Sequence, residues 1–304
     1  MMSNSVTGAC NVDVTNPNYA VMRNMAKYSR GMAVQTSITD MGMASFNLVQ
    51  YLWQTDTLLT NDLDDCRKVP AFQPFFVDET IDKVIFEATG SNLVPYITMP
   101  NQTVIQPALQ YQVGNLYIWT TDRPPVGGYL LNFTTTNSGQ SLCQYRVLGR
   151  STYRLYYGIT SSMSTDMDSK NPVLRTDGHF VAHVNGVWLA DPIDTTIEAT
   201  VWYNDPTTSE RRIMYASSGQ WRDGCDYELY FGSIACRQPG LLFYINVYIT
   251  DTMGLVVMRT TTGYCSPQNI NPPNPDCFNG GVIYNGTCVC PDHFRFAKSI
   301  ENIC

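Results

Sequence analysis

Residues 243–249 read Phe-Tyr-Ile-Asn-Val-Tyr-Ile, and this stretch indicates the fold class of the chain. Phe243 and every second residue after it are apolar and share one face, while Tyr244, Asn246 and Tyr248 share the other. A period of two predicts a β-strand with one face turned to a core. Residues 251–254, Asp-Thr-Met-Gly, predict a turn into a second strand at 255–258, so the pair reads as a hairpin.

Further strands are predicted on both sides of this hairpin. Short segments rich in β-branched and aromatic residues recur, separated by Gly, Pro and Asn turns, at 82–88, 94–98, 116–120, 129–134, 153–158, 180–184 and 196–203. Their spacing is typical of small antiparallel sandwiches. We therefore expect a mainly β protein with two antiparallel β-sandwiches, at 66–140 and 141–265.

Residues 1–65 follow a different pattern. Apolar residues recur at helical spacing at 21–26 and 46–53, with a short strand predicted at 32–34 between them. Helix, strand, helix is typical of an α/β domain. A segment this short cannot close such a sheet, because parallel strands need neighbours and helices on both faces. We expect residues 1–65 to be the C-terminal part of a larger α/β domain.

The charge pattern excludes two classes of partner. Only 15% of the residues are charged, the formal net charge is −7, and Lys and Arg do not cluster. Nucleic-acid binders need a basic surface to neutralise phosphates, and docking on anionic lipid has the same requirement. The longest apolar stretch, residues 241–249, is interrupted by Asn246 and is too short to span a membrane.

The cysteines predict a disulfide-bonded, secreted protein. There are ten, half of them in the last forty residues: Cys10, Cys66, Cys143, Cys225, Cys236, Cys265, Cys277, Cys288, Cys290 and Cys304. An even number in this arrangement indicates disulfides and an oxidising compartment. Zinc is disfavoured because the spacing of Cys288 and Cys290 is too tight for a structural zinc site.

Glycosylation sequons agree with secretion, whereas the N-terminus does not. Asn-x-Ser/Thr triplets occur at Asn101, Asn132 and Asn285. Residues 1–22 are polar and contain no apolar segment of the kind a signal peptide needs. We therefore expect a secreted glycoprotein whose signal peptide and N-terminal part are missing from this chain.

The C-terminal end carries the most specific motif. Residues 277–290 read Cys-Phe-Asn-Gly-Gly-Val-Ile-Tyr-Asn-Gly-Thr-Cys-Val-Cys, and Cys304 follows. This pattern resembles the EGF-like module, and the resemblance implies the pairs Cys277–Cys288 and Cys290–Cys304. One of the six usual cysteines is absent after Asn-Gly-Gly. Residues 274–276 do not match the calcium-binding version of the module, so no cofactor is implied. Residues 266–304 are expected to be a proline-rich linker and this module.

The remaining six cysteines allow fifteen connectivities. We favour Cys143–Cys265, which would close the second sandwich, and Cys225–Cys236. That choice leaves Cys10–Cys66.

The order of these units resembles nematode extracellular proteins related to the infection-response proteins, and the start of hemicentins. Such proteins join a von Willebrand factor A domain, a galactose-binding-like sandwich, an immunoglobulin-like domain and EGF-like modules. The resemblance rests on the segments 25–31, 75–78, 97–101, 125–129, 225–228, 251–254 and 258–261. It implies that residues 1–65 end an A domain, without the Asp-x-Ser-x-Ser metal motif, and that the two sandwiches are galactose-binding-like and immunoglobulin-like.

No catalytic or metal site is predicted. His179 and His183 would share a face on a helix, but their surroundings predict a strand, in which the rings lie about 13 Å apart. A Ser/His/Asp hydrolase lacks the G-x-S-x-G elbow. Trp119, Trp202 and Tyr203 could stack on sugar rings, although large aromatic residues more often fill sandwich cores.

These observations favour a non-enzymatic extracellular adhesion or recognition protein, in innate immunity or the extracellular matrix. Its ligand would be an extracellular protein or a glycan. The alternative is a secreted hydrolase with a nonstandard site.

Overall fold

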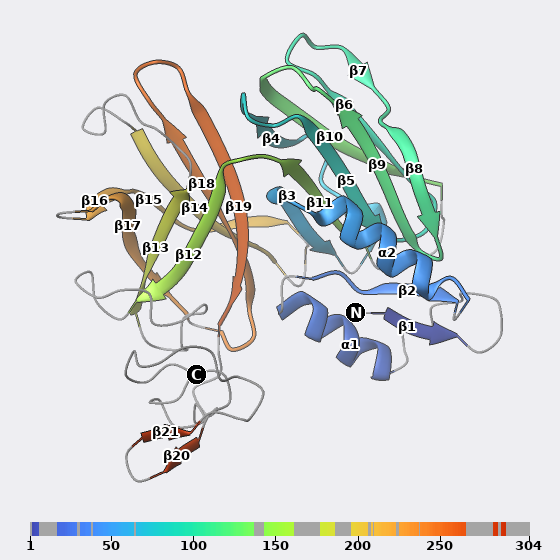
Figure 1. The fold of residues 1–304 in the computed structure, drawn as a ribbon, viewed down its shortest axis with the longest axis horizontal. Coiled ribbons are helices and arrows are strands. Elements are labelled where there is room, and N and C mark those ends of the chain that lie inside the picture. The colour runs from blue at the N-terminus through green and yellow to red at the C-terminus, as the bar shows by residue number, and fades with distance from the viewer. Residues whose placement is uncertain are drawn as a thin grey trace.

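The computed structural model describes residues 2–5, 17–28, 31–37, 39–63, 65–136, 143–160, 177–185, 196–205, 208, 210–222, 225–236, 238–265, 282–284 and 287–289. Within these residues the protein is mainly β, as predicted. Two antiparallel β-sandwiches lie side by side, and a small α/β segment packs beside the first of them (Figure 1).

The first sandwich comprises residues 55–150. One of its sheets has the strand order β3-β11-β5-β9-β8, and the sheet facing it has the order β4-β10-β6-β7. Its strands are β3 (Thr55–Leu63), β4 (Gln73–Val77), β5 (Lys83–Thr89), β6 (Leu93–Thr98), β7 (Val104–Ile105), β8 (Ala108–Val113), β9 (Leu116–Asp122), β10 (Gly127–Thr135) and β11 (Cys143–Arg150).

The second sandwich follows from residue 154. Its sheets have the strand orders β12-β13-β17-β16 and β15-β14-β18-β19. Its strands are β12 (Arg154–Thr160), β13 (Asp177–Asn185), β14 (Thr196–Asn204), β15 (Arg211–Ser218), β16 (Gln220–Arg222), β17 (Cys225–Ala235), β18 (Leu242–Thr250) and β19 (Val256–Tyr264).

Each sandwich encloses an apolar core between its sheets. Phe86 and Tyr129 come from opposite sheets of the first sandwich, and Phe180 and Val247 from opposite sheets of the second. In β18 the alternate residues from Phe243 to Ile249 face this core, as their spacing predicted. The other face of β18 is also buried, at Tyr244 and Asn246, because it packs against the first sandwich.

The α/β segment covers the outer face of the first sandwich. Strand β1 (Met2–Ser5) pairs in parallel with β2 (Val34–Ser37), and the helices are α1 (Pro17–Tyr28) and α2 (Met41–Leu52). Helix α2 rests Leu48 and Leu52 on an apolar cluster from β5, β9 and β11. Strand β2 also lies tightly against the first sandwich, at Gly114 of the turn between β8 and β9. Gly114 has a φ of +56°, and a Cβ atom there would lie 1.9 Å from the carbonyl oxygen of Gln35. Among the described residues no helix is long and apolar enough to cross a membrane.

The predicted boundaries of the first sandwich, 66–140, were wrong. Strand β3 lies within the expected α/β unit and β11 within the expected second sandwich, yet both belong to the first sandwich. The reason is the pairing of β11, which lies between β3 and β5 along its whole length and is opposite Lys83 at Arg150. The α/β origin of residues 2–52 as part of an A domain stays a prediction.

The predicted pairs Cys225–Cys236 and Cys143–Cys265 were also wrong. Cys236 is bonded to Cys265, with their Cα atoms 5.4 Å apart. Cys225 begins β17 and Cys236 follows the end of that strand, so roughly 36 Å separates them at the rise of an extended chain. Cys143 lies in β11 and is buried in the core of the first sandwich.

Two short strands pair near the C-terminus. Strands β20 (Val282–Tyr284) and β21 (Thr287–Val289) are antiparallel, with Tyr284 opposite Thr287. Cys10, Cys277, Cys290 and Cys304 lie outside the described residues, and so does Asn285. The EGF-like identity of this end, its two disulfides and the pair Cys10–Cys66 therefore stay predictions.

Candidate functional site

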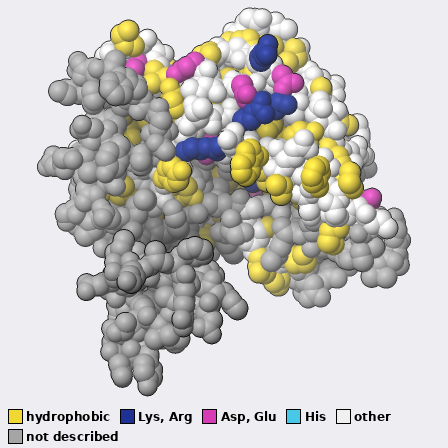
Figure 2. All heavy atoms as spheres, viewed as in Figure 1, with side chains coloured by type: hydrophobic (Ala, Val, Ile, Leu, Met, Phe, Trp, Pro, Cys, Tyr) yellow, Lys and Arg dark blue, Asp and Glu magenta, His cyan; other side chains and the backbone are white. Residues whose placement is uncertain are grey.

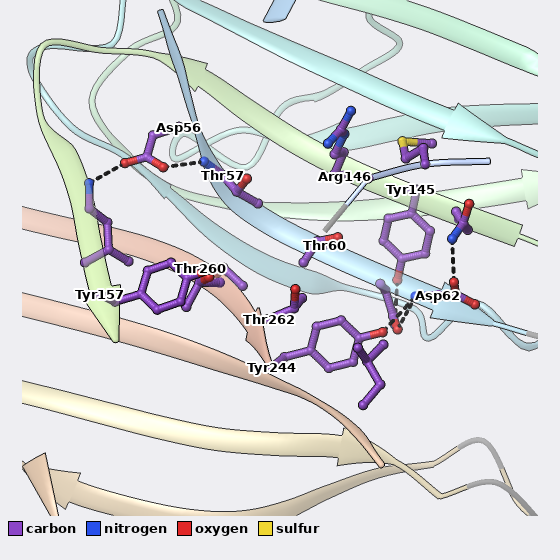
Figure 3. Close-up of a pocket in the computed structure, with 17 residues that line it drawn as sticks. Asp56, Thr57, Thr60, Asp62, Tyr145, Arg146, Tyr157, Tyr244, Thr260 and Thr262 are labelled. Atoms are coloured by element: carbon purple, nitrogen blue, oxygen red, sulfur yellow. Dashed lines mark hydrogen bonds between the residues drawn. The ribbon is translucent and has the colours of Figure 1, made fainter. Parts of the chain in front are cut away.

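Three parts of the chain meet around a cavity of about 190 Å³. The α/β segment contributes Gly31 and Met32, the first sandwich contributes β3 and β11, and the second contributes β12, β18 and β19. Most of the labelled side chains around it are polar (Figure 3). This volume is roughly that of six water molecules in the liquid. It is smaller than the volume of pockets that bind drug-sized ligands.

Strand β3 forms one side of the cavity with a run of polar residues, Asp56, Thr57, Thr60, Asn61 and Asp62. The ladder between β3 and β11 shifts register between Val147 and Leu148. Such a bulge redirects side chains and strengthens the local twist. Around it β3 buries Leu58 and Leu59 in the core of the first sandwich while its polar residues line the cavity.

Asp56 is held rigidly at one end of the cavity. Its carboxylate accepts hydrogen bonds from the backbone N–H of Thr57, at 3.0 Å, and of Leu155 in the second sandwich, at 2.7 Å. The Nε atom of Arg259 lies 3.6 Å away. Burial raises the pKa of Asp56 above its ordinary value, against the lowering effect of these two hydrogen bonds and of Arg259.

Asp62 occupies the other end and ties the α/β segment to the first sandwich. Its carboxylate forms an ion pair with Arg23 of α1 and accepts a hydrogen bond from the amide of Gln144. Arg23 also donates to the carbonyl oxygen of Leu63 at 2.9 Å, and the Gln144 side chain accepts from the backbone N–H of Ala33 at 2.8 Å. Both ends of the cavity are therefore preorganised.

Two phenol groups from opposite sandwiches converge beside Asp62 (Figure 3). Tyr145 donates to Gln73 and accepts from Asn61, at 2.9 Å, while the Asn61 side chain accepts from Asn204 of the second sandwich, at 2.6 Å. Tyr244 accepts from the backbone N–H of Asp62 at 2.9 Å. Burial raises the pKa of both tyrosines well above their ordinary value, so both stay neutral at physiological pH.

A buried ion pair crosses from one sandwich to the other nearby. Arg259 of β19 donates to the carboxylate of Asp78 at 2.7 Å and to the hydroxyl of Ser151 at 2.8 Å. Thr80 donates to Asp78 from its hydroxyl and its backbone N–H. The Arg259 and Asp78 side chains are 1% and 0% exposed. Thr260 adds a hydrogen bond to the carbonyl oxygen of Leu58 at 2.6 Å.

We call these contacts the junction: the hydrogen bonds and ion pairs of Asp56, Asp62, Tyr145, Tyr244, Asp78, Ser151, Arg259 and Thr260. They pair most of the polar groups that the two sandwiches bury against each other, whereas Arg259 Nε and Asn204 Oδ1 form no hydrogen bond. Buried polar groups with specific partners fix a geometry, because any shift of one body leaves donors and acceptors unpaired. The junction thus holds the sandwiches in a defined orientation.

The two carboxylates do not form a catalytic pair. Asp56 and Asp62 lie on the same strand six residues apart, which corresponds to roughly 20 Å of extended chain. The paired carboxylates of glycoside hydrolases lie about 5–9.5 Å apart. Asp56 retains acceptor capacity beyond its two hydrogen bonds, since an ionised carboxylate can accept about four. The arrangement is suited to binding a polar, hydroxyl-bearing group.

Two of the three sequons, Asn101 and Asn132, lie on the first sandwich, outside the junction. Asn101 is exposed in the turn between β6 and β7, where its side chain accepts from the backbone N–H of Thr103 at 3.0 Å. Asn132 is partly buried in β10, opposite Tyr96.

The aromatic residues considered for sugar stacking are core or junction residues. Trp119 is buried and stacks on Tyr117, with ring centroids 5.4 Å apart. Trp202 is buried between Tyr244, at 4.2 Å, and the guanidinium of Arg211, at 4.3 Å. Tyr203 packs against the core of the second sandwich. The prediction that these aromatic residues fill cores is confirmed for Trp119.

Other predicted site residues lie elsewhere. His179 and His183 lie in strand β13, so the prediction of a strand at this position is confirmed. On the face shown in Figure 2, basic side chains lie next to acidic ones, and hydrophobic side chains lie among these charged groups.

The junction was not predicted from the sequence, because no motif marks Asp56, Asp62 or Asp78. The polar and aromatic second face of residues 243–249 was the one signal of it.

Comparison with known proteins gives one relative and several distant folds. No family model matches the chain. The chain is 26% identical to Protein irg-7 of Caenorhabditis elegans over 318 aligned residues, which cover 99% of this chain. The chain spans 14% of the length of that protein. This match fits the resemblance to infection-response proteins and is compatible with an immune-related role.

Solved structures are similar only at a low level. A DUF4785 family protein from Legionella pneumophila aligns with a TM-score of 0.38 at 8% identity, covering 70% of this chain and 61% of the other. The propeptide form of the lipase BlEst2 from Bacillus licheniformis aligns with a TM-score of 0.32 at 9% identity, covering 73% and 46%. Likenesses at this level support no argument about function.

Proposed function

We propose that this chain is part of a non-enzymatic, extracellular recognition protein that acts in innate immunity and binds a glycan or a protein. The observation that carries the proposal is the similarity to Protein irg-7, which extends over 99% of the chain. It includes the α/β segment, both sandwiches and therefore the residues of the junction.

Two features of the structure support this proposal. The first is the disulfide bond between Cys236 and Cys265. Disulfide bonds persist mainly in the oxidising environments that secreted proteins meet, so this bond supports an extracellular protein. The junction holds two sandwiches in one orientation, so a ligand that touches both would meet a preformed surface. A preformed surface lowers the entropy cost of binding.

We further propose that a hydroxyl-bearing group of the ligand enters the junction cavity. Asp56 offers a fixed acceptor at one end of the cavity. Thr57 and Thr60 line the same side of the cavity and carry hydroxyl groups, which can donate as well as accept. A volume of about 190 Å³ suits a single sugar ring or one polar side chain. An uncharged group is suited to this cavity, because the carboxylates of Asp56 and Asp62 already have partners that offset their charge.

The test is binding by the secreted, oxidised 304-residue protein to a glycan array and to whole microbial cells. Thr60→Arg places a long side chain in the cavity, and Thr98→Arg is the matched control on β6 of the opposite sheet. We expect wild type and Thr98→Arg to bind the same glycans or cells, and Thr60→Arg to bind at least tenfold more weakly.

Two outcomes would contradict parts of this account. Equal binding by Thr60→Arg and wild type would place the ligand outside the junction cavity. Turnover of a panel of esters or glycosides, without any binding to glycans or cells, would favour the secreted hydrolase over a recognition protein.

A further inference from the structure

Cys66 and Cys143 lie together in the core of the first sandwich. Cys66 begins the short 3-10 helix η1 (Cys66–Lys68) just after β3, and Cys143 is the first residue of β11. Their exposed fractions are 3% and 0%, and both belong to one apolar cluster. They are separated by 77 positions in sequence, so the fold and not the local chain brings them together.

The backbone pairing accounts for their proximity. In the ladder between β3 and β11, Cys143 lies opposite Leu63, which precedes Cys66 by three residues. Asp65 then accepts a hydrogen bond from the backbone N–H of Arg67 at 3.0 Å and turns the chain into η1. This turn directs Cys66 back toward the start of β11. The two thiol groups are hydrogen-bonded to each other.

We propose that Cys66 and Cys143 form a disulfide bond in the mature protein. The same chain already joins Cys236 to Cys265, from the end of β17 to the end of β19. A compartment that oxidises that pair will oxidise a second pair of adjacent thiols, because its disulfide donors act on any pair that can meet without strain. Each sandwich would then have one internal cross-link.

The reaction needs a disulfide donor, either a small-molecule disulfide or a dithiol oxidoreductase. The thiolate of one cysteine attacks the donor, forms a mixed disulfide and releases one donor thiol. The second cysteine then attacks the mixed disulfide, forms the Cys66–Cys143 bond and releases the other donor thiol. Two electrons reduce the donor, and the two protons of the cysteines end on its thiols.

This step takes place before the first sandwich is fully packed. In the folded state, the hydrogen bond from Cys66 and burial both raise the pKa of the Cys143 thiol, so little thiolate forms there. Buried thiols also exclude the donor. Once formed, the bond closes a loop that contains β4 to β10, and long loops lose most unfolded-chain entropy on cross-linking.

Peptide mapping of the full-length protein tests the proposal. The protein is secreted under oxidising conditions, alkylated without reduction in denaturant, treated with peptide N-glycosidase and digested with trypsin. Cys66 is the single cysteine of tryptic peptide 31–67, and Cys143 is the single cysteine of peptide 84–146. We expect these two peptides to be linked, with a mass two hydrogens below their sum, and to separate on reduction.

The same digest contains its own control and its contrary outcomes. Peptide 223–237 carries Cys225 and Cys236, and peptide 260–295 carries Cys265, Cys277, Cys288 and Cys290. The Cys236–Cys265 bond is expected to link these two peptides, and fragmentation that assigns the link to Cys236 and Cys265 shows that oxidation succeeded. With that control positive, alkylated thiols in peptides 31–67 and 84–146 would overturn the proposal. So would a link from either peptide to another, such as Cys66 to peptide 1–23, which carries Cys10.

A stability measurement adds an independent readout. Under oxidising conditions the Cys66→Ala/Cys143→Ala variant should melt about 10 °C below wild type, since it lacks the cross-link. Addition of a reductant should narrow this difference. An unchanged melting temperature would contradict a structural disulfide, and a variant that fails to fold leaves the peptide map to decide.

Discussion

The interiors of the two sandwiches and the junction between them are built by different rules. Inside the sandwiches, residues such as Phe86 and Val247 are apolar, and alternation along the strands places them. At the junction, the buried residues are charged or hydroxylated, and each one has named partners, as Arg259 has in Asp78 and Ser151. Apolar packing accepts several arrangements of similar volume, whereas a buried ion pair accepts very few.

Stability and orientation therefore come from different parts of the molecule. Apolar burial supplies most of the free energy of folding and has no direction. Hydrogen bonds across the junction contribute less net free energy, but they leave unpaired groups if one sandwich rotates. Substitutions in the two regions should therefore have effects of different kinds.

The largest effect is expected for Arg259→Met, which leaves the Asp78 carboxylate buried without its cationic partner. Removal of one partner of a buried ion pair costs about 3–5 kcal/mol. Denaturant unfolding should show this loss and should split into two transitions, because the sandwiches no longer support each other. The double variant Arg259→Met/Asp78→Leu should recover at least half of the loss. If the single variant loses less than about 1 kcal/mol, the ion pair does not hold the junction.

An interior substitution should cost slightly less and leave the coupling intact. Leu131 is fully buried in the core of the first sandwich, and Leu131→Ala removes its packing at a cost of about 3 kcal/mol. Unfolding should remain a single transition at lower denaturant concentration, because the junction contacts are unchanged. Two separate transitions in this variant would show that core packing, and not the junction, couples the sandwiches.

A smaller effect is expected when one hydrogen bond of the junction is removed. Tyr244→Phe keeps the ring that stacks on Trp202 but deletes the hydroxyl that accepts from the backbone N–H of Asp62. We expect a loss of about 1 kcal/mol in the free energy of unfolding. Tyr248→Phe on the same strand is the matched control. An equal loss in both variants would argue against a specific role for the Tyr244 hydroxyl.

The smallest effect is expected at the exposed ion pair of Asp82 and Arg150. Hydrogen bonds from Arg150 hold the pKa of Asp82 below its ordinary value. Because the folded state favours the ionised form, the pair stabilises the protein above about pH 4, and this contribution is lost as the pH falls through the folded pKa.

An NMR titration of the Asp82 carboxyl should show that low midpoint, and Arg150→Met should raise it toward the ordinary value. The free energy of unfolding at pH 7 should change by about 0.5 kcal/mol or less, as is usual for exposed pairs. A midpoint that Arg150→Met does not move would mean that the guanidinium is not the cause.

Much of the fold could be predicted from local sequence patterns. The alternation in 243–249 and in the shorter segments around it marked the interior strands, because core-facing residues repeat at the period of the pleat. The helical spacing at 21–26 and 46–53 marked α1 and α2.

The strand partners, the cysteine pairing and the junction could not be predicted in this way. Strand β3 reads Thr-Asp-Thr-Leu-Leu-Thr-Asn-Asp-Leu, which does not alternate, because a bulge interrupts it and because its polar residues meet a second sandwich. The assignment of β11 to the first sandwich depends on pairing with strands more than fifty residues away. Asp78 and Arg259 are 181 positions apart, and nothing local to either residue indicates the other.

The junction is expected to hold the two sandwiches as one rigid body. Residual dipolar couplings of backbone amides in β5 and β9, and in β14 and β18, measured on the oxidised 304-residue protein, report the relative orientation of the sandwiches. We expect couplings from both sandwiches to fit one alignment tensor with the orientation of the structure. Two tensors of different magnitude, one for each sandwich, would show that the sandwiches move independently.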